Sequence, residues 1–470
     1  MALTLSYLAH VMSCVVVHDA DDEILKCQCT LDLLQRYNGL LELANDQIHI
    51  FPFSHVKLCW FRLYTDASVA KAVKILEEYC NVGTNALLAE AVAALDMALI
   101  MAGGLGRQDL IQDVLATIQK HVGTDSDEAD YPRKRPRLGA GQITSTTSTS
   151  KQLLPDDPVS IPKISFPVPA IAAPSLEDFQ THLHHQTDPL ILNGALNHWP
   201  ALRKWRELSF WEDLTLGGRR LVPVELGRSY VDSGWGQEIL PFKRFLHDYI
   251  LRHPASRDSR TGYLAQHDLF KQIPALHADI ATPDYCYLDA PPPAAGTPLA
   301  LAKSAKTQQL SHPSTLPQPK AQSAEQSSAE QSSAGSEVQS NIWFGPAWTI
   351  SPLHHDPYHN ILCQVVGKKY LRLYSPHHSS ILQPMSNSVL APHLIDTSGD
   401  LAIDMSNTSS IDVAAMETSP QEDWDDMYPN ITDVPYVECV LEAGQALYIP
   451  IGWWHYVRSC SVGISVSFWW

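Results

Sequence analysis

The stretch Ser351-Pro-Leu-His-His-Asp-Pro357 decides how the second half of this 470-residue chain is interpreted. In a β-strand, side chains two residues apart point to the same face, so His354 and Asp356 share a face while His355 points away. An imidazole and a carboxylate from one short strand are two corners of a facial triad, the ligand set of non-haem Fe(II) sites. The tripeptide H-x-D by itself is a weak signal, because many chains contain it by chance.

A second segment, about 100 residues further along, offers the third corner. In Glu442-Ala-Gly-Gln-Ala-Leu-Tyr-Ile-Pro-Ile-Gly-Trp-Trp-His455 the pattern predicts a turn, a strand over 446–449 and a second turn that delivers His455 to the next strand. Val462 to Phe468 then alternates as a half-buried strand does. A double-stranded β-helix of the cupin or jelly-roll kind would place the two segments side by side. The alternative is that His455 is a hydrogen-bonded structural residue beside two tryptophans.

The chain divides by composition into three regions. Residues 1–122 carry apolar side chains at helical spacing, for example Val69, Val73 and Leu76, which predicts an all-helical domain. Residues 123–160 contain too little apolar surface to fold and predict a disordered linker. Residues 161–470 are rich in predicted strands. We therefore expect an α+β protein in which a helical N-terminal domain precedes the double-stranded β-helix.

Two interruptions in the strand-rich region predict disordered insertions. Residues 291–340 are dominated by Ala, Ser, Gln and Pro. Residues 386–430 hold nine acidic residues and no Lys or Arg. These carboxylates predict weak recruitment of a basic protein partner.

Overall charge and targeting signals narrow the function classes. The formal net charge is −18, which gives no basic field for general nucleic-acid binding. No stretch approaches the ~20 apolar residues that span a bilayer, and Met1 to Val17 lacks the features of a signal peptide. We expect an intracellular protein with no membrane or direct nucleic-acid partner. The basic cluster Arg133 to Arg137 predicts a nuclear location if it is a localisation signal, and a cytoplasmic one if it is only a solvated charge run.

One lysine of the strand after Gly367 lies on an apolar face. Lys369 is in phase with Leu371 and Leu373, whereas Lys368 falls on the other face. A buried ammonium is costly unless it is paired, so an anionic ligand would suit Lys369. The alternative is that its side chain reaches out to solvent.

Four motifs together resemble the JmjC oxygenases over residues of about 165 to 470, the two insertions excepted. They are Trp343-Phe-Gly-Pro-Ala347, Ser351 to Pro357, Gly367 to Pro376 and Ser465-Val-Ser-Phe-Trp-Trp470. The resemblance implies Fe(II) held by His354, Asp356 and His455, with 2-oxoglutarate and O₂ as cosubstrates. It also implies that Lys369 binds the distal carboxylate of 2-oxoglutarate, and that Tyr263, Ser351 and Asn360 are its hydrogen-bonding companions in cosubstrate binding. For Ser351 and Asn360 an ordinary place at a turn or a strand end remains open.

Such enzymes oxidise a C–H bond of a protein side chain, and the resemblance suggests two substrates. One is arginine, hydroxylated on carbon: Glu225 would pair with the guanidinium, and Trp235 and Trp343 would wall it. The other is a methylated lysine of a histone tail, demethylated by the same chemistry. Glu225 as a surface residue beside a core tryptophan is the alternative. We also weigh a catalytically silent cupin-like scaffold, against which the complete triad argues, and a metalloprotease, for which no H-E-x-x-H motif is present.

Overall fold

The computed structural model describes residues 3–29, 31–51, 55–124, 152–185, 187–231, 234–252, 261–311, 338–385 and 405–470. They form two compact units. The helical unit comprises the described residues up to Leu153 together with Glu207–Leu221. The β-rich unit comprises Leu154–Arg206 and the described residues from Val222 to Trp470.

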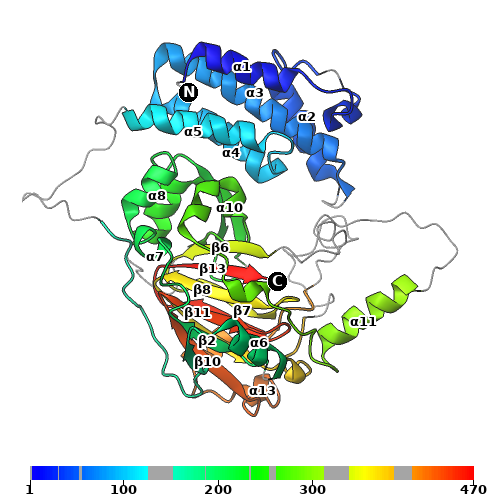
Figure 1. The fold of residues 1–470 in the computed structure, drawn as a ribbon, viewed down its shortest axis with the longest axis vertical. Helices are drawn as coiled ribbons and strands as arrows, with labels where there is room; N and C mark the ends of the chain where they lie inside the picture. The colour runs from blue at the N-terminus through cyan, green and yellow to red at the C-terminus, as the bar shows by residue number, and fades with distance from the viewer. Residues whose placement is uncertain are drawn as a thin grey trace, which may run out of the picture. The chain divides into compact units, whose positions relative to one another are not determined.

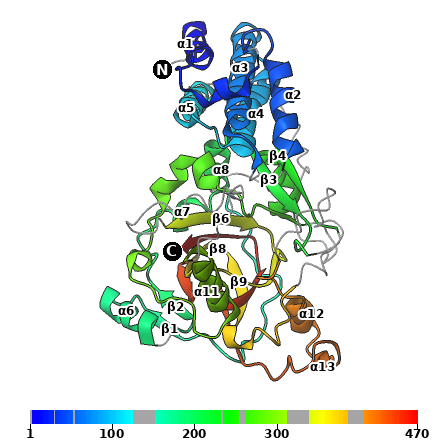
Figure 2. The same ribbon diagram turned by 90° about the vertical axis from the view of Figure 1, so that its right-hand side faces the viewer.

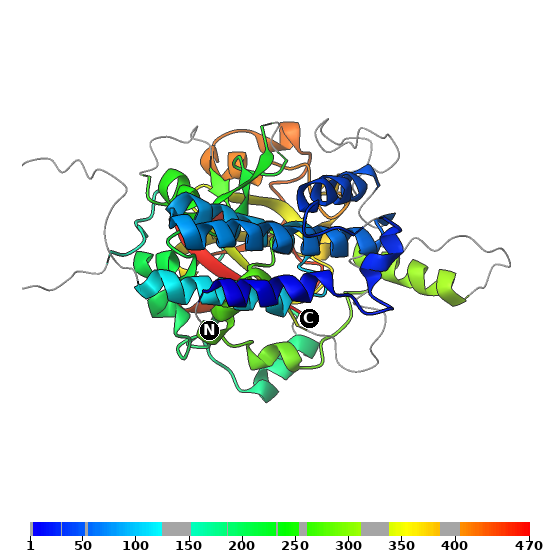
Figure 3. The same ribbon diagram turned by 90° about the horizontal axis from the view of Figure 1, so that it is seen from above.

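The helical unit is built around one long buried helix. Its α-helices are α1 (Leu5–Val16), α2 (Tyr37–Ile50), α3 (Leu58–Val82), α4 (Asn85–Ala102), α5 (Gln108–Thr124) and α8 (Leu208–Leu214), with a 3₁₀ turn at Glu23–Cys27. Helix α3 packs against α1, α2 and α4, as the views in Figures 1 and 3 show. Helices α3 and α4 end at Gly83 and Gly103, whose positive φ angles of 73° and 60° suit glycine. The predicted all-helical N-terminal region is confirmed.

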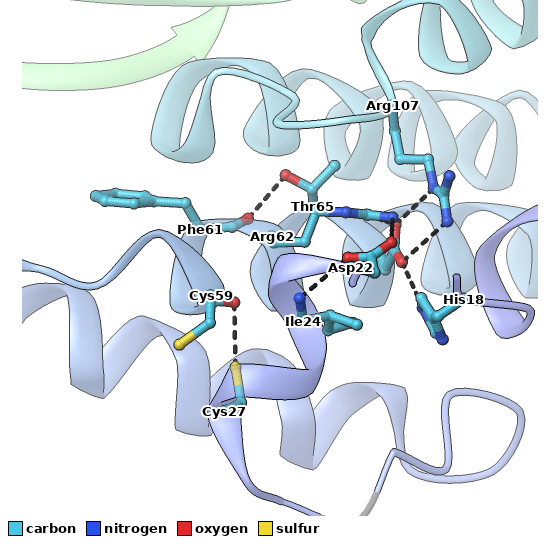
Figure 4. Close-up of polar contacts among 10 residues, drawn as sticks. His18, Asp22, Ile24, Cys27, Cys59, Phe61, Arg62, Thr65 and Arg107 are labelled. Carbon is cyan, nitrogen blue, oxygen red and sulfur yellow. Dashed lines mark hydrogen bonds and ion pairs between the residues drawn. The ribbon is translucent and has the colours of Figure 1, made fainter. Parts of the chain in front are cut away.

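A buried ion-pair cluster joins α3 to its neighbours (Figure 4). The carboxylate of Asp66 is fully buried and accepts hydrogen bonds from Arg62 and from Arg107, and it contacts His18 at 3.0 Å. Arg62 also pairs with Asp22 at 3.0 Å. Two carboxylates thus face two guanidinium groups, which leaves no buried charge of this cluster without an opposite partner.

Helix α4 is a longer apolar stretch than we expected from the sequence anywhere in the chain. By length and composition alone, Asn85–Ala102 is apolar enough to cross a membrane. In the structure it is a core helix of the bundle, and its buried residues include the charged Asp96. The core helix of a soluble protein can have the same length and apolar composition as a membrane-spanning helix.

The β-rich unit contains two sheets that face each other and a third, smaller one (Figure 2). The six-stranded sheet has the order β1 (Ala170–Ala172), β2 (Leu190–Asn193), β11 (Gln445–Ile449), β8 (Asn360–Val366), β13 (Gly463–Trp469) and β6 (Gln339–Gly345). The four-stranded sheet has the order β10 (Tyr436–Glu442), β9 (Lys368–Tyr374), β12 (Trp454–Ser459) and β7 (Ile350–His355). The third has the order β4 (Gly236–Pro241), β3 (Leu221–Leu226) and β5 (Gly262–Tyr263).

One hydrophobic core fills the space between the two large sheets. Leu362 and Leu447 come from the six-stranded sheet, and Leu371, Leu373 and Leu441 from the four-stranded sheet. These residues alternate with outward-facing ones along their strands, as the inner faces of a sandwich require. The predicted double-stranded β-helix is confirmed in this arrangement.

Short helices surround the sheets. They are α6 (Leu176–His185), α7 (Ala201–Lys204), α9 (Phe242–Phe245), α10 (Leu269–Gln272), α11 (Pro298–Ser311), α12 (Val413–Thr418) and α13 (Trp424–Met427). The remaining turns are a π-helical turn at Leu246–Ile250 and 3₁₀ turns at Pro274–Asp279, Asp284–Tyr287 and Pro376–His378.

The structure departs from the expected boundaries in three places. Glu207–Leu221, expected in the oxygenase domain, belongs to the helical unit. The expected insertion at 291–340 contains helix α11, and only 312–337 lie outside the described residues. Of the expected insertion at 386–430, residues 405–430 are folded, because Ile411, Val413 and Met416 are buried in a core with β7 and β12. The basic cluster at 133–137 lies outside the described residues.

Candidate metal centre and cosubstrate pocket

The three predicted ligands come together at one end of the four-stranded sheet. Strand β12 pairs with β7 so that His455 is the register partner of His354, and Asp356 follows directly after β7. One ligand atom from each of the three lies within 4.8 Å of the others. Ligands that share one transition-metal ion at about 2 Å each lie at such separations. Two imidazoles and one carboxylate on a single side of the ion form the facial triad of non-haem iron sites.

Backbone carbonyls orient both histidines. The Nδ1 atom of His354 lies 2.7 Å from the carbonyl oxygen of Pro352, and that of His455 lies 3.0 Å from the carbonyl oxygen of Trp453. A neutral imidazole that donates its Nδ1–H to a carbonyl presents the lone pair of Nε2 to a metal. Burial lowers the pKa of His455 to about 4, with His354 adding to the effect, so this ring is neutral at physiological pH.

Asp356 is held by the end of the chain. Its Oδ2 accepts a hydrogen bond of 3.0 Å from the indole Nε1–H of Trp469, and its carbonyl oxygen accepts one of 3.1 Å from the backbone N–H of Gly452. Burial alone would raise the pKa of Asp356, but His455, His354 and the Trp469 hydrogen bond bring it below the ordinary value. The carboxylate is therefore ionised, as a metal ligand must be.

The ammonium group of Lys369 is buried in a pocket that offers it no carboxylate among the described residues. Lys369 is 3% exposed, and its Nζ donates to Ser465 Oγ at 2.7 Å and to Tyr263 Oη at 3.2 Å. Burial lowers the pKa of Lys369 to about 7. Only hydroxyl groups donate or accept at this ammonium group in the described contacts, so an anionic ligand would supply its counter-charge. The predicted inward orientation of the Lys369 side chain is confirmed.

The two further residues predicted for this pocket differ in their surroundings. Asn360, at the start of β8, is buried, and its side-chain oxygen has no hydrogen-bond partner among the described residues. A buried orphan of this kind calls for a ligand or a water. Ser351 is half-buried in β7, and within the described part of the chain no contact joins it to Lys369.

Two of the three predicted substrate residues, Glu225 and Trp235, meet at the small sheet. Glu225 of β3 is 8% exposed and pairs in register with Tyr263 of β5. The indole N–H of Trp235 is 3.5 Å from the Glu225 carboxylate, and burial raises the pKa of Glu225 despite this contact. Trp343 belongs to β6 of the six-stranded sheet, and its ring centroid is 6.1 Å from that of Tyr263. The alternative of a surface Glu225 is wrong.

Comparisons with known proteins identify the family of the chain. Residues 176–470 match the model of the cupin-like domain family. The chain is 32% identical over 442 residues to lysine-specific demethylase JMJ30 of Arabidopsis thaliana, which covers 91% of this chain and 84% of that protein. It is 36% identical over 303 residues to lysine-specific demethylase 8 of Xenopus tropicalis, which covers 64% of this chain and 52% of that protein.

The chain belongs to the JmjC oxygenase family. Human bifunctional peptidase and (3S)-lysyl hydroxylase JMJD7 is a more distant relative, 26% identical over 314 residues, which covers 64% of this chain and 84% of that protein. As a JmjC oxygenase with a complete His-Asp-His triad, the protein is an enzyme, and the silent scaffold is set aside.

Several residues of this JmjC site were not among the predicted ones. Ser465 binds Lys369, and Trp469 binds Asp356, although both lie in the motif that carried the resemblance. Thr408 comes from the segment expected to be disordered: it forms a bridge with His354, and its hydroxyl is 3.4 Å from that of Tyr230. Period-two alternation in β13 groups Ser465 with Ser467 on the polar face of the strand, so it did not predict the contact with Lys369, and no local signal pointed to Thr408.

Proposed function

We propose that this JmjC enzyme uses Fe(II), 2-oxoglutarate and O₂ to hydroxylate an arginine side chain of a basic protein. The observation that carries the choice of arginine is the buried carboxylate of Glu225. Its only hydrogen-bond donor in the described contacts is the uncharged indole N–H of Trp235, at 3.5 Å. A buried carboxylate without a cation is costly, and a planar guanidinium would pair with it through two hydrogen bonds.

Two of the residues that would hold the metal already have the required protonation states: His455 is neutral and Asp356 is ionised. When iron and 2-oxoglutarate are bound, they supply the oxidation of a C–H bond that side chains cannot perform. His354 and His455 turn their Nδ1 atoms to backbone carbonyls, which leaves Nε2 of each ring for the metal, and Asp356 presents a carboxylate. None of the three has to act as a general base.

The cosubstrate pocket suits a dianion at its far end. The ammonium of Lys369 would pair with the distal carboxylate of 2-oxoglutarate, and Tyr263 and Ser465 keep that ammonium in position. The side-chain oxygen of Asn360 has no partner among the described residues, but it is an acceptor and could not bind a carboxylate, so a hydrogen bond from its Nδ2 to 2-oxoglutarate stays a proposal from the resemblance. Ser351 stays a proposal from the resemblance alone.

The substrate pocket would bind the guanidinium beside the cosubstrate pocket. Glu225 and Tyr263 are register partners, and Tyr263 contacts Lys369, so one strand pair connects the two pockets. Trp235 beside Glu225 and Trp343 beside Tyr263 offer aromatic faces to a cation. Demethylation of a methyl-lysine in a histone tail is the second candidate, because two relatives are named lysine-specific demethylases. Action in the nucleus, the cytoplasm or both stays open under either candidate.

Replacing Glu225 tests the choice of substrate. We expect Glu225→Gln to weaken the binding of an arginine peptide at least tenfold, because truncating one partner of a buried charge pair costs about 2–5 kcal/mol. Calorimetry without O₂, with Mn(II) and 2-oxoglutarate bound, measures this affinity for matched arginine, lysine and trimethyl-lysine peptides.

The same titrations contain the control and the contradiction. The affinity for 2-oxoglutarate should be equal in wild type and Glu225→Gln, since Lys369 is untouched. Equal binding of arginine to both proteins, or tighter binding of trimethyl-lysine than of arginine to wild type, would contradict arginine as the substrate.

A further inference from the structure

We propose that Trp469 is a positioning residue that keeps Asp356 bound to the metal through one oxygen only, so that one coordination position stays open. The inference rests on the iron and 2-oxoglutarate chemistry of the proposed function, and it is independent of whether the substrate is arginine.

Without a constraint, the carboxylate of Asp356 is placed to use both oxygens. Its Oδ1 lies 3.9 Å from Nε2 of His354, and its Oδ2 lies 3.7 Å from Nε2 of His455. Each oxygen thus faces the ligand atom of one histidine. Carboxylates bind metals through one oxygen or through both, and nothing in the two histidines selects between these modes.

The number of coordination positions makes the mode important. His354, Asp356 and His455 would hold the metal through one atom each, and the proposed chemistry would need the remaining coordination positions for the keto acid and O₂. A carboxylate that takes a second position leaves too few for both cosubstrates. One-oxygen binding by Asp356 is therefore a requirement of the proposed chemistry.

The indole of Trp469 engages one of these two oxygens. Its Nε1–H donates to Oδ2 at 3.0 Å. An indole N–H is a donor only and cannot itself bind a metal, so it holds the oxygen without competing for the ion. The hydrogen bond uses electron density of Oδ2 and fixes the rotation of the carboxylate, which leaves Oδ1 as the metal-binding oxygen.

The position of Trp469 is itself fixed by its two neighbouring strands, β6 and β8. Its backbone pairs in register with Gln339 of β6 and with Asn360 of β8. Its ring packs edge-on against Trp343, with centroids 6.2 Å apart and planes at 75°. Trp343 in turn donates from Nε1 to Ser467 Oγ at 3.0 Å. The donor therefore belongs to a packed aromatic pair and is in place before any ligand arrives.

The adjacent Trp470 provides a matched control. Its Nε1 is buried and has no hydrogen-bond partner among the described residues, and its ring lies against His359 with centroids 5.5 Å apart. Trp469→Phe removes the N–H from Asp356 and keeps a ring against Trp343. Trp470→Phe makes the same chemical change where no hydrogen bond is lost.

The experiment measures metal and cosubstrate binding in the full-length protein, with Co(II) as a spectroscopic probe. For wild type, Trp469→Phe and Trp470→Phe, we would record Co(II) affinity, the Co(II) absorption spectrum, and 2-oxoglutarate affinity at saturating Co(II). We expect Trp469→Phe to change the spectrum and to weaken 2-oxoglutarate binding at saturating Co(II) roughly 10–100-fold, the range for loss of a partner to a metal ligand. Trp470→Phe should match wild type, and thermal denaturation should show that all three proteins are folded.

Each other outcome overturns a defined part of the account. If Trp469→Phe binds Co(II) and 2-oxoglutarate like wild type, with the same spectrum, Trp469 does not control the carboxylate. If Trp470→Phe weakens binding as much as Trp469→Phe, aromatic packing and not the hydrogen bond is responsible. If wild type binds no Co(II), the proposed function and this inference fail together.

Discussion

At the residue scale, the proposed role of Lys369 would link the pH of the solution to 2-oxoglutarate binding. Burial lowers its pKa to about 7, so in the absence of 2-oxoglutarate the ammonium loses its proton as the pH rises through neutrality. The bound dianion favours the protonated form and raises this pKa again. Binding is therefore strongest below pH ~7 and weakens as the pH rises above that value.

We expect the dissociation constant of 2-oxoglutarate to rise about tenfold per pH unit above pH ~7 until the pKa of the complex is reached, since one pKa unit is about 1.4 kcal/mol. Lys369→Arg should bind with little pH dependence, because a guanidinium keeps its proton throughout this range. Calorimetry on the Mn(II)-loaded proteins between pH ~6.5 and ~8.5 measures both. A flat wild-type profile, or the same slope in both proteins, would show that Lys369 does not set the pH response.

The residues that could be predicted from the sequence are those whose facing follows from strand periodicity. His354, Asp356 and Lys369 were placed on the correct faces by spacing within one strand. The hydrogen bond from Trp469 to Asp356 joins residues 113 positions apart, so it depends on how β13 and β7 are assembled. Periodicity along one strand contains no information on such pairs, and Glu225 was reached only through the family resemblance.

At the scale of elements, the segment 405–411 lies beside strand β7, which carries the predicted ligand His354. The backbone N–H of His355 donates to the carbonyl of Asn407 at 2.9 Å, and that of Ser409 donates to the carbonyl of Leu353 at 2.8 Å. Thr408 is thereby the bridge partner of His354. The segment thus adds an isolated antiparallel β-bridge beside β7, at the predicted ligand His354.

Helix α12 anchors this segment through a buried ion pair. Arg458 of β12 is fully buried, and Glu417 of α12, with a side chain 5% exposed, accepts its hydrogen bonds. The guanidinium also lies over the ring of Trp348, 4.4 Å from its centroid. The anchor thus connects the strand that carries His455 to the helix that follows Thr408.

We expect Glu417→Gln to lower the free energy of unfolding by about 3–5 kcal/mol, because it leaves a buried guanidinium without its carboxylate. Urea denaturation followed by tryptophan fluorescence measures the change. Glu442→Gln is the control: its pair with Lys368 is exposed and should contribute at most about 1 kcal/mol. Equal effects of the two substitutions would mean that the Glu417 pair is not an anchor.

The acidic composition of residues 386–430 led to the wrong prediction for residues 405–430, which are folded. Counting nine carboxylates predicted a disordered, partner-recruiting insertion, but Ile411, Val413 and Met416 recur at a spacing that buries them together. Several of the acids have structural partners: Glu417 binds Arg458, and Asp425 binds Thr432. Composition averaged over 45 residues was a poorer guide than the positions of three apolar ones.

At the scale of the whole molecule, the chain crosses between its units more than once. The helical unit includes Glu207–Leu221, where Arg220 donates to the fully buried Asp96 at 2.8 Å and Leu216 joins the helical core. A division by composition at a linker could not find this, because a returning segment of 15 residues has no distinctive composition. The fold class was predictable because it depends on periodicity, which is local; the unit boundaries depend on long-range pairing.

The most direct test of the central claim is mass spectrometry of peptides after reaction. Matched peptides that carry arginine, lysine or methyl-lysine would be incubated with the full-length enzyme, Fe(II), 2-oxoglutarate and O₂, with Asp356→Ala as the blank. The account predicts a product heavier by one oxygen atom on arginine, released with succinate and absent from the blank. A methyl-lysine product lighter by one methylene, with arginine unchanged, would contradict the account.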